Sequence, residues 1–154
     1  MITLKNAEQI AKMREAGHLL NDVLMEVCRA VEPGVTTRHL DHIAERLIRQ
    51  AGAKPSFLGY EGYPASLCTS VDDIVVHGFP DDKPLQEGSI VGLDIGLILN
   101  GWQSDMARTV CVGNVSAETR RLVDVTKQSF FKGLAFCKPG YRLGDVGNAI
   151  QRYA

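Results

Sequence analysis

Two aspartates, Asp94 and Asp105, are the residues of this sequence whose type and spacing are best suited to chemistry. Each lies in a stretch with the pattern of a β-strand, and Asn100-Gly101 between the two stretches favours a tight β-hairpin turn. A regular hairpin through that turn places both carboxylates on one face, as diagonal neighbours about 7–8 Å apart at the backbone. Two carboxylates so placed repel each other, and a divalent cation between them turns that repulsion into binding. The pair predicts a metal site, with a solvated outer sheet face as the alternative interpretation.

The hairpin is expected to consist of strands 90–99 and 102–112. Its register pairs Asp94 with Ala107 and Asp105 with Gly96. Along the first strand, Asp94 alternates with leucine and isoleucine side chains that form the opposite, apolar face. Small residues around the carboxylates leave room for an ion and a substrate. Aspartate is uncommon in strand interiors, which favours a functional site.

A second group of candidates lies upstream, in a stretch rich in glycine and proline. Tyr60 and Tyr63 offer apolar rings with polar tips that suit a binding pocket, although such rings also anchor ordinary loops. His77 follows the β-branched run 74–76, which predicts a short strand with the histidine at its end, facing the site. An imidazole there can donate a hydrogen bond or move a proton, or it can simply bond the backbone.

Helices are expected on both sides of the sheet-forming region. The first is predicted over 7–31, with Asn6 as its N-cap, and the second from Thr36 or Thr37 to Gly52. A third is predicted over 116–136, and a fourth from 145 to the end of the sequence. A helix–Pro-Gly–helix unit occurs twice, 106 residues apart, and indicates an internal duplication. Residues 1–112 then form a first repeat of two helices and an antiparallel sheet, and 113–154 the two opening helices of a second. Together they make one incomplete catalytic domain, 1–154.

Composition narrows the class of protein. The 154 residues are 45% hydrophobic and 23% charged, with a formal net charge of -1, which argues against a nucleic-acid-binding or membrane-surface protein. The N-terminus has no apolar signal segment, and no stretch is long enough to span a membrane. Four cysteines without a CxxC pair are expected to be free thiols, and the protein to be cytoplasmic.

The chain resembles the type I methionine aminopeptidases over nearly all its length. The resemblance is carried by YEGYPASLCTSVDDIVVHGFP at 60–80, EGSIVGLD at 87–94 and NGWQSDMARTV at 100–110. It implies the mixed α/β pita-bread fold, in which two related halves surround a dinuclear metal site. The chain would then be a C-terminally truncated fragment that holds the first half and the opening helices of the second.

The resemblance also implies roles for particular residues. It makes Asp94 and Asp105 metal ligands, His77 a catalytic residue that contacts substrate, and Tyr60, Tyr63 and Cys68 the lining of the methionine pocket. The implied cofactors are two divalent ions (Co, Mn, Fe or Zn). A further histidine and two glutamates would complete their ligands from beyond Ala154. Asp72-Asp73 stands where members of this family commonly have Asn-Glu, and this departure puts a peripheral monovalent-cation site in doubt.

The implied reaction is removal of the N-terminal methionine, by hydrolysis of the first peptide bond with a metal-bridging hydroxide. The expected partner is a peptide or nascent-chain N-terminus, with the ribosome as a further candidate and the full-length form as a monomer. The fragment alone is expected to be inactive and to self-associate. Two alternatives stay open: a non-catalytic binding protein of the same fold, and a small α/β protein with one structural cation.

Overall fold

The computed structural model describes residues 3–154, and its contacts divide the chain into a first unit that ends at Asn114 and a second that begins at Val115. The first unit contains α1 (Ala7–Arg29), α2 (Thr37–Gln50), β1 (Lys54–Pro55), the short 3₁₀ helix η1 (Tyr60–Gly62), β2 (Leu67–Val71), β3 (Ile90–Leu99) and β4 (Trp102–Cys111). The second contains α3 (Ala117–Leu134) and α4 (Leu143–Tyr153). Within residues 3–154, no helix combines the length and apolar character needed to cross a membrane.

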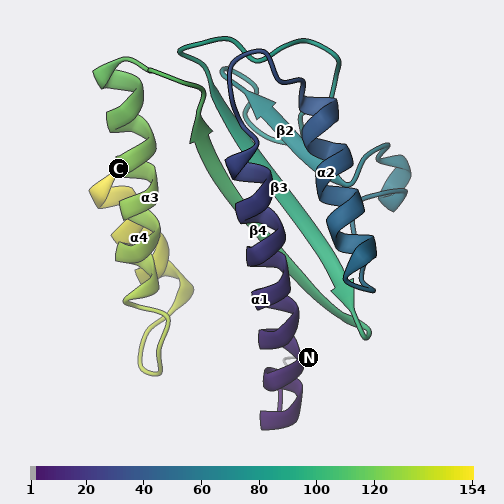
Figure 1. Ribbon diagram of the computed structural model, residues 1–154. Coiled ribbons are helices and arrows are strands. Elements are labelled where there is room, and N and C mark those ends of the chain that lie inside the picture. Colours follow the sequence, from purple (N-terminus) through teal and green to yellow (C-terminus); the bar gives the residue numbers. More distant parts are fainter. Residues whose placement is uncertain (1–2) are drawn as a thin grey trace. The chain divides into compact units, whose positions relative to one another are not determined.

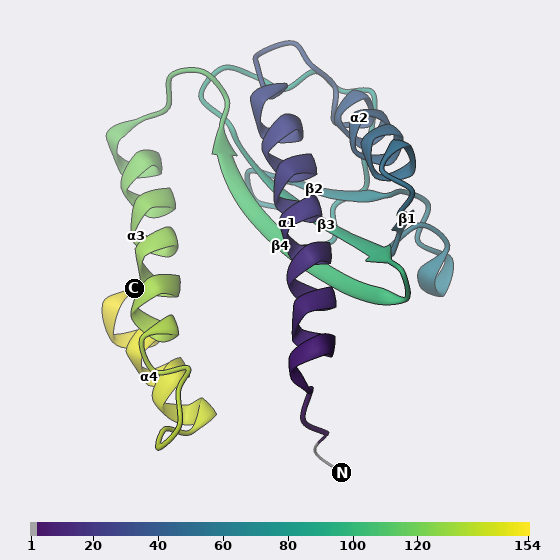
Figure 2. The ribbon, with the colours of Figure 1, turned by 60° about the horizontal axis from the view of Figure 1, so that its bottom comes forward.

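Local signals begin α1 and α2 where the sequence predicts, while α4, predicted from 145, begins at Leu143. Asn6 closes a capping box with Gln9, each side chain accepting from the other's backbone N–H at 2.9 Å. Thr36 caps α2 by accepting from the His39 amide. The first turns of α1 are less buried than the rest of its apolar side, because they run past the sheet (Figure 2). Ile10 and Met13 in these turns are 45% and 41% exposed.

The sheet is organised around β3. Strand β4 pairs with one edge of β3 over its whole length, and β2 pairs with the N-terminal part of the other edge (Figure 1). The two-residue strand β1 pairs with the C-terminal part of that other edge. Asn100 and Gly101 both have positive φ, 51° and 82°, as a two-residue type I′ turn requires. The predicted register is confirmed: Asp94 lies opposite Ala107, and Asp105 lies opposite Gly96.

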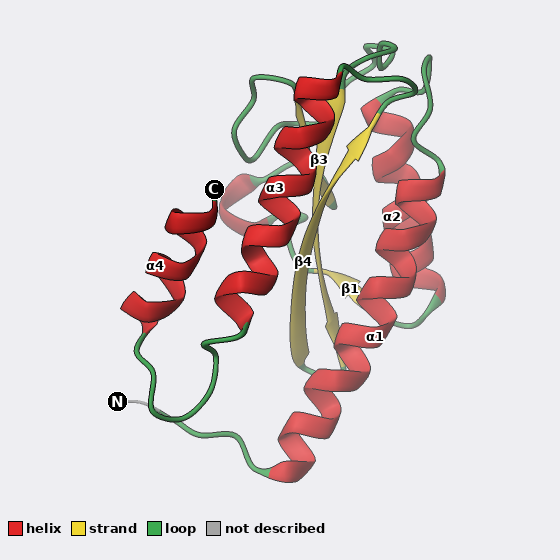
Figure 3. Cartoon of the chain, turned by 90° about the vertical axis from the view of Figure 1, so that its left-hand side faces the viewer, coloured by secondary structure: helices red, strands yellow, loops and turns green. Residues whose placement is uncertain are grey.

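One face of this sheet forms the core of the first unit. Helix α1 lies along β3 and β4, and α2 lies along β1 and β2, on the same side of the sheet (Figure 3). Leu93, Ile95 and Leu97 point into this layer and are fully buried. Because strand side chains alternate, Asp94 and Asp105 point to the opposite face. The helices therefore cover the apolar side and leave the carboxylate side uncovered by α1 and α2.

The strand predicted over 74–76 is wrong, because these residues form an exposed loop, with Val75 89% exposed. Asp72 has a φ of 50°, which turns the chain out of β2 before the run begins. The run has high β propensity but no neighbouring strand to pair with in the described residues, and propensity without a partner does not make a strand. His77 consequently lies in a loop and not at a strand end.

The second unit is a helix pair. Ser116 caps α3 by accepting from the Thr119 amide, and the helix ends two residues before the predicted Phe136. Gly133 lets α4 approach closely, since a methyl group there would lie 2.7 Å from Ile150 Cγ1. Gly140 has a φ of 94°, and Gly34 at the corresponding turn has a φ of 92°. Both turns thus have a glycine at a similar positive φ, and the division into repeats at residue 112 stays a prediction.

Candidate metal centre

The carboxylate pair combines one half-buried and one exposed side chain on adjacent strands. Asp94, on β3, is half-buried, and Asp105, on β4, is exposed. Burial raises the pKa of Asp94 above its ordinary value, the negative charge of Asp105 raises it further, and His77 lowers it. The two carboxylates are therefore close enough to repel electrostatically, and holding both ionised without a cation costs free energy.

The donor set fits a hard divalent cation, but only in part. No lysine or arginine among residues 3–154 forms an ion pair with either aspartate, so their charge is not neutralised by a side chain. Carboxylate oxygens are suitable ligands for divalent ions. However, no cluster of three or more His, Cys, Asp or Glu side chains in this range is placed to hold an ion. Asp94 and Asp105 thus fit as two ligands of a site that needs more.

Cys68 and Tyr63 place neutral groups beside the pair. Cys68, on β2, lies directly opposite Asp94 in the ladder and is only 4% exposed. Burial raises the pKa of both the Cys68 thiol and the Tyr63 phenol, so both keep their protons at neutral pH. Tyr63 packs edge-to-face against Phe57 and Phe79, with ring centroids 6.5 and 5.2 Å apart. The surroundings of Asp94 are therefore partly apolar and uncharged.

The predicted site residues differ in how near they lie to the carboxylate pair. Tyr60 lies on η1, is 67% exposed, and has no side-chain hydrogen bond among those found for residues 3–154. His77 is exposed in its loop, with a φ of 58°, and its effect on the pKa of Asp94 puts it within electrostatic range of the pair. The structure thus groups Tyr63, Cys68 and His77 with the first aspartate and leaves Tyr60 at the periphery.

Asp41 is a buried carboxylate that sequence reasoning did not single out. It lies on α2, is 8% exposed, and accepts from the backbone amides of Ser66 and Leu67 at 2.8 and 2.9 Å. Burial raises its pKa above the ordinary value, more than these hydrogen bonds lower it. Asp41 ties α2 to the start of β2, the strand that carries Cys68. Its position next to buried Leu40 on the apolar side of α2 was the available signal.

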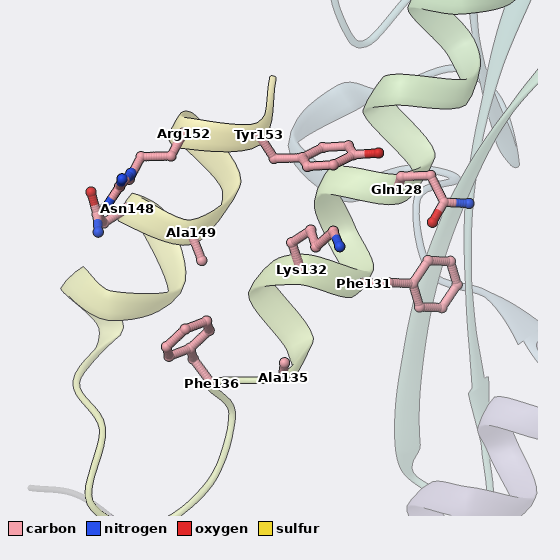
Figure 4. Close-up of a pocket in the computed structure, with 9 residues that line it drawn as sticks. All are labelled: Gln128, Phe131, Lys132, Ala135, Phe136, Asn148, Ala149, Arg152 and Tyr153. Carbon is pink, nitrogen blue, oxygen red and sulfur yellow. The ribbon is translucent and has the colours of Figure 1, made fainter.

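The groove between α3 and α4 in the second unit has a different chemistry (Figure 4). It has a volume of about 580 Å³, and its lining contains no carboxylate, thiol or imidazole. Lys132 Nζ lies 5.2 Å from the centroid of the Tyr153 ring across this groove. Because Lys132 and Arg152 bring positive charge to the lining and no carboxylate balances it, the groove does not suit a divalent cation.

Comparison with known proteins identifies the family of this chain. Residues 11–154 match Metallopeptidase family M24. The chain is 49% identical over 153 residues to a methionine aminopeptidase from Clostridium perfringens, covering 99% of this chain and 61% of that protein. The chain therefore spans about three-fifths of the length of the curated relatives it matches.

Solved structures agree with this assignment. The crystal structure of methionine aminopeptidase from Rickettsia prowazekii superimposes with a TM-score of 0.97 at 41% identity, covering 99% of this chain and 62% of that one. A prolidase from Pyrococcus furiosus, only 22% identical, shares the fold with a TM-score of 0.86, covering 97% of this chain and 43% of that one. The helices packed on an antiparallel sheet are thus part of the mixed α/β pita-bread fold, and the chain belongs to metallopeptidase family M24.

Proposed function

We propose that this chain carries the first two metal ligands of an enzyme that removes the N-terminal methionine from peptides and nascent proteins. The observation that supports the proposal best is the pairing of Asp94 and Asp105 on one sheet face, in a chain 49% identical to a methionine aminopeptidase. A simple solvated sheet face would not need the partial burial that raises the pKa of Asp94.

Asp94 and Asp105 would hold divalent ions, two in the complete site. Bound there, such ions supply Lewis acidity and lower the pKa of a coordinated water. His77, in its exposed loop, would donate a hydrogen bond to the substrate beside the scissile bond and help to move its proton. Tyr63 and Cys68, both neutral, would accept the apolar methionine side chain, with Tyr60 at the outer edge. The substrate is a peptide N-terminus. That the enzyme acts at the ribosome and that its full-length form is a monomer both stay predictions.

We also propose that the 154-residue chain by itself binds divalent ions weakly and hydrolyses methionyl peptides negligibly. Two carboxylates are too few ligands to hold a dinuclear site tightly. The described residues provide no third His, Cys, Asp or Glu near the pair.

Calorimetric titration with Mn²⁺ tests the metal ligands. We expect weak binding to the chain, loss of that binding in Asp94→Asn and in Asp105→Asn, and no change in Asp22→Asn, an exposed aspartate on α1. Equal Mn²⁺ affinity in all four proteins would contradict the assignment of the pair.

Hydrolysis of a Met-Gly peptide with added Co²⁺ or Mn²⁺ tests the activity. The chain alone should give no measurable turnover, and clear turnover would overturn its proposed inactivity. A fusion in which the remaining C-terminal part of the Clostridium perfringens relative follows Ala154 should cleave methionyl peptides and lose this activity with Asp94→Asn. An active fusion that keeps its full rate with Asp94→Asn would refute the proposed role of this residue.

A further inference from the structure

The loop that carries His77 is anchored at both of its ends. At its start, the Asp72 carboxylate accepts from Ser89 Oγ at 2.9 Å and from the Ile90 amide at 3.0 Å, and its own amide donates to the Ile90 carbonyl. These bonds tie the first residue after β2 to the beginning of β3. Between the two anchors the apolar residues 74–76 are exposed and pack against little else.

The second anchor is Gly78, the residue directly after His77. The Thr69 amide donates to the Gly78 carbonyl at 2.8 Å, and the Gly78 amide donates to Ser70 Oγ at 3.3 Å. The Tyr63 hydroxyl reaches the same Gly78 carbonyl at 3.1 Å. Gly78 is buried against β2 so closely that a methyl group there would overlap the Thr69 carbonyl oxygen. The loop is thus fastened to the edge of β2 beside the histidine.

The hydroxyl of Tyr63 contributes to this anchor as a hydrogen-bond donor. It has a single proton, which it directs to the Gly78 carbonyl at 3.1 Å or the Leu67 carbonyl at 3.3 Å. Because burial raises the pKa of Tyr63, the phenol keeps its proton at neutral pH and acts as a donor. Its ring packs edge-to-face against Phe57 and Phe79, and these two contacts restrict where the hydroxyl can lie.

The conformation of His77 needs such support. Its φ of 58° lies in the left-handed region, which a residue with a Cβ adopts only at a cost in free energy, so the surrounding structure has to hold it there. The side chain itself is exposed and forms no hydrogen bond among those found for residues 3–154, so the restraint must come from the neighbouring backbone. Gly78, with its three hydrogen bonds, is the adjacent fixed point.

We propose that Tyr63 is a positioning residue, whose hydroxyl holds the Gly78 carbonyl and thereby fixes the backbone of His77 beside the carboxylate pair. This role is distinct from lining a side-chain pocket, because it depends on the hydroxyl and not on the ring. It rests on the proposed function only in treating His77 as the residue that contacts substrate. Ser70 assists from the other side of Gly78.

Amide hydrogen exchange and ¹⁵N relaxation of the 154-residue chain test this without any turnover measurement. In Tyr63→Phe, which keeps the ring, the Thr69 and Gly78 amides should exchange about three- to tenfold faster, the change expected for the loss of one hydrogen bond. The order parameter of His77 should fall from about 0.85 towards about 0.6, while amides of the β3–β4 ladder keep their protection. Ser70→Ala should selectively loosen Gly78 in the same way.

Tyr60→Phe is the matched control, since Tyr60 is exposed and its hydroxyl has no partner among the hydrogen bonds found for residues 3–154. It should leave all these values unchanged. Unchanged exchange at Thr69 and Gly78 in Tyr63→Phe would overturn the proposal. So would a uniform rise in exchange over the whole sheet, because Tyr63 would then support general stability and not the loop. Neither outcome depends on metal binding or peptide hydrolysis, so failure here is distinct from failure of the proposed function.

Discussion

Removing the buried carboxylate of Asp41 should destabilise the first unit strongly, while replacing it with an amide should not. Asp41 accepts from the Ser66 and Leu67 amides at 2.8 and 2.9 Å, and Ser66 is fully buried. Asp41→Ala leaves both amides without an acceptor. A buried polar group left unpaired costs about 1–3 kcal/mol, so two give an expected loss of about 2–6 kcal/mol. Asp41→Asn keeps an oxygen at the same place and is expected to stay within about 1 kcal/mol of the parent.

The pH dependence has a defined sign. Burial raises the pKa of Asp41 above its ordinary value of 3.8, so the folded chain binds this proton more tightly than the unfolded chain. The stabilisation from protonation is fully present below pH 3.8 and is lost as pH rises through the raised pKa. Asp41→Asn lacks this step, so its stability relative to the parent should improve as pH rises across that window.

Urea unfolding followed by circular dichroism, from pH 4 to pH 8, measures both effects. Asp22→Ala is the control for loss of an exposed aspartate and should change stability by no more than about 0.5 kcal/mol. Equal stability of Asp41→Ala and Asp41→Asn at neutral pH would refute the reasoning, because it would mean that the two amides do not depend on an acceptor at this position.

Three other predictions follow from the site and the surface. Because the pKa of Asp94 is raised, Mn²⁺ affinity should fall as pH is lowered through that raised pKa, and a pH-independent calorimetric affinity would contradict this. Gly96→Ala would drive a methyl group into Ser56 Oγ and should lower the free energy of unfolding by about 1–3 kcal/mol, measured with urea. Exposed Phe130 and Phe131 should cause concentration-dependent self-association, which size-exclusion chromatography should show and which changing both to serine should reduce.

Elements specified by short-range interactions could be read from the sequence. Asn100-Gly101 adopts the positive φ angles of a type I′ turn, and this local preference was enough to establish the register that brings Asp94 and Asp105 to one face. The capping box of Asn6 likewise depends on residues three positions apart. In both cases the interacting groups are neighbours in the chain, so the pattern alone contains the information.

Features that depend on distant partners could not be read in this way. The 74–76 run has the composition of a strand but is a loop, because Asp72 turns the chain and bonds to Ser89 and Ile90. The role of Asp41 depends on amides 25 and 26 residues away. Neither contact leaves a periodic signal in the sequence.

The amino-acid sequence by itself thus determined the hairpin, the starts of α1, α2 and α3, and the shared face of the two aspartates. The tertiary structure decided which hydrogen bonds hold the segments around that face. The Tyr63 hydroxyl donates to the Gly78 carbonyl, Asp72 accepts from the start of β3, and Asp41 accepts from the residue before β2. The physical reason is that a turn or cap is stabilised within a few residues. The position of His77, in contrast, depends on hydrogen bonds that form only after separate segments have packed together.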